Sequence, residues 1–149
     1  MKRKIYILTV FILVLLFAFS SCAIGHIEDT NGDDTSPVTL TDEDIVKSKS
    51  HTATLSSKGY ANSTYYYSAS KLSGVLSINK HRVDDGTFVI NMTSTLLSGN
   101  ARICVLLDGE IKAEIPLGEG QSVSLSGNGL YEIKIAAESA QLSIEYTVD

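Results

Sequence analysis

The chain has 149 residues, a formal net charge of -5 and only two cysteines. That length allows one domain with short appendages, because two domains would each lack an adequate core. Seven of the 17 acidic residues precede residue 47, so the remainder is nearly balanced and has no basic surface for nucleic acid.

The first 21 residues have the pattern of a secretory signal. A basic triplet at residues 2–4 precedes an apolar run over residues 5–19, which only Thr9 interrupts, and two serines follow. A basic start, a short apolar core and a small-residue exit favour export, with residues 1–21 removed. A permanent transmembrane anchor is the alternative, but a helix that spans a membrane needs about 20 apolar residues.

Phe19-Ser20-Ser21-Cys22 resembles the lipobox of bacterial lipoproteins. In that family, cleavage falls just before a cysteine whose thiol carries diacylglycerol. The resemblance covers only the first 22 residues, and Phe19 stands where the family usually has leucine or another aliphatic residue. It implies that lipid on Cys22 inserts into the bilayer and holds the protein on the cell membrane, facing outward. Cleavage after Ser20 by an ordinary signal peptidase is the alternative, and would leave a soluble secreted protein.

Residues 22–50 are rich in acidic, hydroxyl and glycine residues, contain Pro37 and show no apolar period. This composition predicts a flexible acidic tether between the anchor and the folded domain. Residues 29–33 place oxygen side chains as a calcium loop would, but Asp34 replaces the essential glycine and Leu40 the bidentate glutamate. The sequence therefore predicts no metal site in the tether.

From residue 51 the chain consists of short runs rich in β-branched and aromatic residues, separated by turn residues. Several runs alternate apolar and polar residues, as strands with one buried face do. The predicted strands are residues 60–68, 74–81, 87–96, 102–107, 110–116, 122–126, 131–136 and 142–148. Seven or eight strands without a crossover helix predict an all-β domain over residues 51–149, an antiparallel β-sandwich. A jelly-roll-like sandwich is the first choice, and an immunoglobulin-like one the second.

Asp108-Gly109 between two apolar runs predicts a two-residue type I′ hairpin. The register that follows places Cys104 on the core face. It places Ile103, Val105 and Leu107 on the opposite face, beside the charged residues of the next strand. Those three aliphatic side chains are a candidate patch for a protein partner, or are covered by a loop or a neighbouring strand.

Side chains that could perform chemistry are few and scattered. His26, His51 and His81 do not stand at metal-ligand spacing, and the chain has neither a nucleophile elbow nor a phosphate-binding loop. A buried Cys104 is expected to be inert, although a disulfide with Cys22 is the alternative if that residue carries no lipid. The sequence therefore predicts no enzyme, no metal and no cofactor.

Tyr60 and the run Tyr65-Tyr66-Tyr67 are the most distinctive polar aromatic feature. Alternation sends Tyr65 and Tyr67 to one face of a strand and Tyr66 to the other. Tyr65 and Tyr67 could stack on sugars or anchor a protein interface. The alternative is a purely structural use in the strand, because tyrosine is an ordinary strand residue.

The predicted domain is similar to the small β-sandwich accessory modules attached to secreted bacterial proteins. This similarity lies in the pattern of short strands and turns, without a diagnostic motif, and it implies binding more readily than catalysis. The leading hypothesis is a non-enzymatic surface lipoprotein that binds an envelope protein or an extracellular ligand. A carbohydrate-binding accessory domain and a structural component of an envelope complex are the alternatives.

Overall fold

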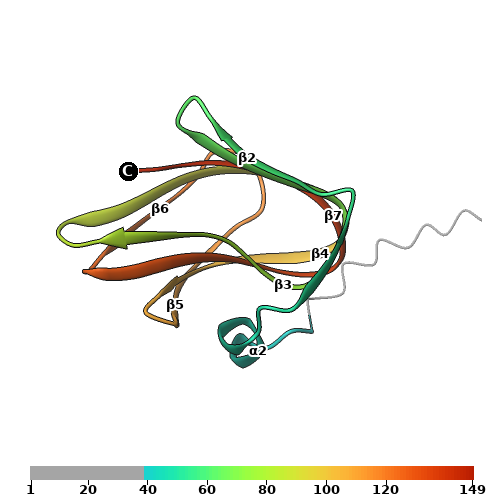
Figure 1. Cartoon of the computed structure of the whole chain (residues 1–149), viewed down its shortest axis with the longest axis horizontal. Helices are drawn as coiled ribbons and strands as arrows, with labels where there is room; N and C mark the ends of the chain where they lie inside the picture. The colour runs from blue at the N-terminus through green and yellow to red at the C-terminus, as the bar shows by residue number, and fades with distance from the viewer. Residues whose placement is uncertain (1–38) are drawn as a thin grey trace, which may run out of the picture. The chain divides into compact units, whose positions relative to one another are not determined.

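The structure is a computed structural model that describes residues 39–149. It contains the helix α2 (Asp42–Lys47) and the strands β1 (His51–Thr54), β2 (Ser57–Ala61), β3 (Thr64–Val83), β4 (Thr87–Leu107), β5 (Glu110–Ile115), β6 (Gln121–Ser126) and β7 (Gly129–Val148) (Figure 1). The predicted signal sequence, the lipobox with Cys22 and the calcium-like residues 29–34 lie outside the described residues.

The seven strands of the described part form one open antiparallel sheet. Their order is β1-β3-β7-β4-β5, with β2 beside β3 and β6 beside β4. The predicted all-β antiparallel fold is therefore confirmed, while the strand order does not identify a jelly roll. The last strand of the chain, β7, lies in the middle of the sheet between β3 and β4.

Three long strands carry the sheet through a bend. The strands β3, β4 and β7 are each 20 or 21 residues long. Their ladders shift register near residues 69–74 of β3 and 96–100 of β4. Gly99 and Ser139 lie at this bend with φ angles of 72° and 51°, and Figure 1 shows β7 doubling back there. Residues 71–73, 98–100 and 138–140, which fall between predicted strands, are therefore bends within continuous strands.

The bend divides the sheet into two halves that face each other like a sandwich. The first half-sheet consists of β2, β6 and residues 64–69, 87–96 and 142–148. The second half-sheet consists of β1, β5 and residues 72–83, 98–107 and 129–140. Each long strand therefore contributes its two ends to opposite layers.

Side chains from both half-sheets meet in one apolar core. Phe88 of the first half-sheet stacks on Tyr131 of the second, with ring centroids 4.4 Å apart. The buried members are Tyr67, Ala69, Leu72, Ile78, Phe88, Ile90, Met92, Ile103, Val105, Ile115, Tyr131, Ile133, Ile135, Ala137, Ala140, Leu142, Ile144 and Tyr146. Their alternation along the strands is the period-2 pattern of the sequence.

The end of the predicted tether is folded. Thr41 begins α2 with a capping box, in which its hydroxyl accepts from the Asp44 N–H and the Asp44 carboxylate accepts from the Thr41 N–H. Three acidic residues in the first turn and Lys47 in the last suit the helix dipole. The folded unit therefore begins before residue 42, and the boundary predicted at residue 51 is wrong.

The outer face of the second half-sheet is covered by α2. Ile45 is fully buried there in a small apolar cluster with Val75, Cys104, Leu106 and Ala136. The predicted burial of Cys104 is confirmed, but the residue lies beneath the helix rather than between the half-sheets. Burial raises the pKa of its thiol to about 11.

The hairpin predicted at Asp108-Gly109 forms, with φ angles of 49° and 88° that suit a type I′ turn. The first two pairs of the predicted register are present. A bulge then shifts the pairing, so that Cys104 lies opposite Glu114 instead of Ala113. One extra residue in β5 reverses the faces of all that follows.

The predicted outward orientation of Ile103, Val105 and Leu107 is wrong. Ile103 and Val105 are fully buried between the half-sheets, and Leu107 packs against the same core. The bulge resolves the conflict that led to the prediction, because it turns Glu114 to the outer face and Ile115 into the core. These three aliphatic side chains do not form an exposed patch.

Candidate functional site

The outer face of the first half-sheet is an exposed, polar surface. The strand registers place its side chains in rows: Thr64 beside Thr147, then Asn91, and Tyr66 beside Glu145, then Thr93. Two serines, Ser68 and Ser143, begin a third row that Thr95 completes. We call this surface the polar face; its residues are Thr64, Tyr66, Ser68, Asn91, Thr93, Thr95, Ser122, Ser124, Ser143, Glu145 and Thr147.

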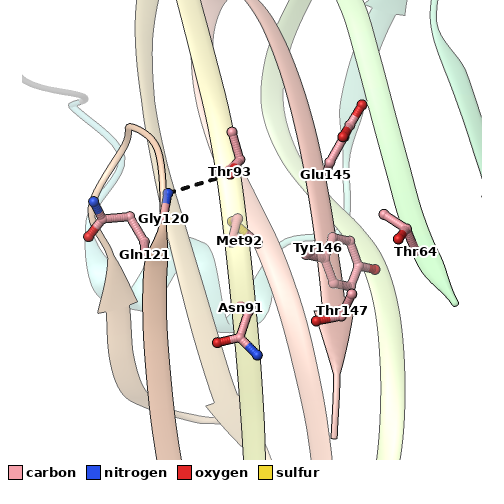
Figure 2. A pocket seen from close by; sticks show the side chains of 9 residues that line it. All are labelled: Thr64, Asn91, Met92, Thr93, Gly120, Gln121, Glu145, Tyr146 and Thr147. Atoms are coloured by element: carbon pink, nitrogen blue, oxygen red, sulfur yellow. Dashed lines mark hydrogen bonds between the residues drawn. The ribbon is translucent and has the colours of Figure 1, made fainter.

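A shallow groove of about 290 Å³ crosses the polar face from β6 to β3. Figure 2 shows Gln121 and Gly120 at one side and Thr64 at the other, with the strands β4 and β7 between them. The N–H of Gly120 donates to the hydroxyl of Thr93, 3.4 Å away. Buried Met92 and Tyr146 line the floor of the groove, and the side chains around them carry hydroxyl, amide and carboxylate groups.

Tyr66 is the exposed aromatic ring of the polar face. Gly59 of β2 lies directly opposite Tyr66, and a side chain on Gly59 would collide with the hydroxyl end of the Tyr66 ring. The ring therefore lies across the neighbouring strand and not upright from the sheet. It is 41% exposed and stands next to Glu145 in the same row. This arrangement gives a flat apolar surface beside a hydrogen-bonding carboxylate.

The predicted ligand-binding pair, Tyr65 and Tyr67, faces the interior instead. The two residues do share one face, as alternation predicted, but Tyr67 is buried in the core and burial raises the pKa of its hydroxyl. Tyr65 is half-buried, stacked on Tyr146 at 5.1 Å and in contact with Tyr60 at 4.4 Å. Neither residue belongs to the polar face.

The position of Tyr66 on the exposed face could have been predicted from the turn that precedes it. Asn62 and Ser63 have φ angles of 51° and 62° and join β2 to β3 as a tight hairpin, where the sequence pattern predicted one strand over residues 60–68. Recognising that hairpin would have placed Gly59 opposite Tyr66.

Of the two histidines that the structure describes, His81 has the more enclosed ring, which points between the half-sheets. Its ring lies 5.5 Å from Tyr65 and 5.9 Å from Phe88, and desolvation lowers its pKa. Its buried Nε2 has no hydrogen-bond partner among the described residues. Residues 39–149 contain no group of three or more His, Cys, Asp or Glu side chains that could hold a metal ion.

A second groove, of about 250 Å³, adjoins the polar face near the bend. Leu55 and Leu97 flank it and are 85% and 69% exposed. Its floor consists of small side chains, including Ser68, Ala69 and Ser143. The strongly exposed aliphatic side chains of the described chain therefore lie here and not at residues 103–107.

None of the described helices is long and apolar enough to cross a membrane. Cys22, the predicted site of lipidation, lies outside the described residues. Comparison with protein-family models finds no match, and comparison with curated proteins finds no significant relative.

Proposed function

We propose that this protein is an exported, lipid-anchored binding module that holds a neutral, hydroxyl-rich glycan on its polar face. The lipobox-like sequence supports the anchor on Cys22. The observation that carries the binding role is the Tyr66 ring lying over Gly59, in one row with Glu145 and Thr93. An aromatic ring beside hydrogen-bonding groups matches the apolar face and the hydroxyl rim of a sugar.

The chemistry of the polar face favours a neutral ligand over a charged one. Glu145 is the charged residue among the members of the face, and the others offer hydroxyl and amide groups. Hydroxyl and amide groups both donate and accept hydrogen bonds, as sugar hydroxyls do. A phosphate or a nucleic acid would need basic side chains, which this face lacks.

The shape of the groove favours an extended ligand. Small-molecule sites are usually enclosed and mostly apolar. The groove here is shallow and open to solvent, and it extends from Gly120 and Gln121 beside β6 to Thr64 of β3 (Figure 2). Neighbouring strands lie about 4.8 Å apart, so the rows present a regular series of polar groups to a chain of sugar units.

The test is binding of the full chain, in mild detergent, to an array of neutral oligosaccharides and polysaccharides. On a glycan that binds, we expect Tyr66→Ala to weaken affinity at least tenfold, which is about 1.4 kcal/mol. Glu145→Gln should weaken binding less, because the amide keeps one acceptor and loses the charge-assisted hydrogen bond.

The matched control is Tyr60→Ala. Tyr60 is 60% exposed and lies on the neighbouring position of β2, but it packs on Tyr65 and does not belong to the polar face. This variant should bind as the parent does. Absence of binding to every glycan, or an equal loss in the Tyr60 and Tyr66 variants, would contradict the proposal.

A further inference from the structure

The strand β6 is an edge of the first half-sheet without the usual protection. Within residues 39–149 it pairs with β4 alone, and that ladder runs from Thr87–Ser126 to Met92–Gln121 without a bulge. Its sequence, Gln-Ser-Val-Ser-Leu-Ser, has no charge and no proline. Exposed edges usually carry charges, prolines or bulges that prevent pairing with another strand. By contrast, β5 carries Glu110, Lys112 and Glu114.

The backbone groups of β6 that point away from the sheet can be identified. Val89 of β4 exchanges hydrogen bonds with Asp149, at 3.0 and 2.9 Å, so its polar groups point toward the β7 side. In an antiparallel strand the direction alternates, so Phe88 and Ile90 point toward β6 and meet Leu125 and Val123. The N–H and C=O groups of the intervening serines, Ser122, Ser124 and Ser126, therefore face outward.

We propose that β6 pairs with β6 of a second copy of this chain, antiparallel, about a two-fold axis at Ser124. The sequence of β6 is self-complementary in this register. Ser124 lies opposite Ser124 of the partner subunit, and Ser122 opposite Ser126 of the partner subunit. Val123 lies opposite Leu125 of the partner subunit, so a branched apolar side chain meets another.

The hydrogen-bond pattern agrees with this register. The outward-facing serines are the residues that would form hydrogen-bonded pairs, each exchanging two N–H···O=C bonds. Val123 and Leu125 would form the non-hydrogen-bonded pairs, whose side chains approach most closely. Both side chains are half-buried in one copy and would be covered further. A self-complementary strand of this kind generates a closed dimer with one two-fold axis.

The dimer would join two polar faces into one continuous surface. Ser122 and Ser124 belong to the polar face, and the proposed pairing aligns them with the serines of the partner subunit. An extended ligand could then contact both copies. The dimer does not depend on glycan binding, and each can fail without the other.

Cysteine crosslinking tests the register. In the full chain carrying Cys22→Ala, Ser124→Cys should form a disulfide-linked dimer on mild oxidation, because hydrogen-bonded partners lie about 5.5 Å apart between Cα atoms. The matched control is Ser122→Cys, whose two copies would lie four residues out of register, roughly 13 Å apart. Alone it should form no disulfide-linked dimer, and it should crosslink when mixed with Ser126→Cys. Buried Cys104 is common to all these variants.

A second measurement follows the dimer without a crosslink. Ser124→Pro removes one outward N–H, which an edge strand tolerates in the monomer, and light scattering should show a monomer. Ser124→Thr keeps that N–H and should remain dimeric, and circular dichroism verifies that both variants are folded. If Ser124→Pro does not fold, the crosslinking pattern of the cysteine variants alone tests the proposed β6 pairing. A monomeric parent protein, equal crosslinking of the two single-cysteine variants, or a dimer in folded Ser124→Pro would overturn the proposal.

Discussion

At the scale of single residues, the described chain contains an enclosed histidine whose protonation opposes folding. His81 lies between Tyr65 and Phe88, where the half-sheets face each other, and burial lowers its pKa from the ordinary value of 6.5. The unfolded chain therefore binds a proton at a higher pH than the folded one. Stability is full above pH 6.5 and decreases as the pH falls through 6.5 toward the lower folded pKa.

We predict that His81→Phe reduces the acid sensitivity of folding. Phenylalanine fills similar space among the aromatic rings and does not titrate. Urea unfolding at pH 7.5 and pH 5 should show that the parent protein loses more stability on acidification than the variant. His51→Phe is the control, because His51 is exposed in β1 and should leave the acid sensitivity of the parent unchanged. An identical loss in parent and His81→Phe would refute the assignment.

Gly99 is a second residue whose identity the bend requires. Its φ is 72°, and a Cβ there would lie 2.5 Å from the backbone oxygen of Ser139. We predict that Gly99→Ala destabilises the fold by about 2–3 kcal/mol, through backbone strain and this collision. Gly86→Ala is the control, because Gly86 also has a positive φ but no atom within 4 Å of the added carbon. Thermal unfolding should show the larger loss for Gly99→Ala, and equal losses would mean that the close approach is unimportant.

At the scale of elements, a buried lysine attaches α2 to the sheet. Lys134 of β7 is 1% exposed, and its ammonium donates to the carbonyls of Ile45, Val46 and Ser48 at 2.7, 2.8 and 3.2 Å. These carbonyls lie at the C-terminal end of α2, where a cation is favourable. Desolvation lowers the pKa of Lys134, although the nearby Glu132 carboxylate opposes that shift.

We predict that Lys134→Met loosens α2, because three helix carbonyls lose their donor. Hydrogen bonds to charged groups contribute about 1.5–3 kcal/mol, so a loss of about 2 kcal/mol is expected in urea unfolding. The thiol of Cys104, buried beneath α2, should also react faster with a thiol reagent in a Cys22→Ala background. Lys112→Met is the control, since Lys112 is half-exposed and forms an ion pair only with Glu110 among the described residues. Unchanged thiol reactivity in Lys134→Met would show that Lys134 is not needed to hold the helix on the sheet.

The elements also show which parts of the fold the sequence reveals. Period-2 alternation identified most strands, and Asp108-Gly109 located its hairpin, because both signals are local. Residues 98–100 looked like a turn between two strands because a glycine is equally compatible with a hairpin turn and with a bend inside one continuous strand. The bulge in β5 and the cover that α2 provides were not apparent, since both depend on contacts between distant residues. The capping box that begins α2 was present in the sequence, but a six-residue helix leaves almost no periodic pattern.

The candidate site was harder to predict than the fold for the same reason. Tyr65, Tyr66 and Tyr67 were recognised as distinctive, and their alternation was assigned correctly. Which of the two faces is exposed depends on the facing half-sheet, which contacts Tyr65 through His81. The position of Tyr66 over Gly59 depends on the register of β2 with β3. Both facts belong to the assembled sheet and not to any local stretch of sequence.

At the scale of the whole molecule, the proposed anchor and the polar face have to work together. The polar face belongs to the first half-sheet, while α2, through which the chain enters the fold from Cys22, covers the second half-sheet. A fully extended chain spans at most about 3.5 Å per residue, so residues 22–39 can reach roughly 60 Å. That reach is sufficient to let the folded domain lie away from the membrane surface at which lipid on Cys22 would be inserted.

The proposed lipid on Cys22 can be tested by fractionation and by labelling. A single acyl chain holds a protein only weakly and two or more hold it stably, so lipid on Cys22 should keep the parent protein in the membrane fraction through salt and carbonate washes. Cys22→Ala removes the acceptor thiol, so it should abolish incorporation of labelled fatty acid. The folded domain should remain intact, because Cys22 precedes the first described residue. Cys104→Ser is the matched control: it removes the other cysteine of the chain and should leave labelling unchanged. Labelling that persists in Cys22→Ala, or an intact Met1 in the mass of the mature parent protein, would contradict both the anchor and the outward location that the binding proposal assumes.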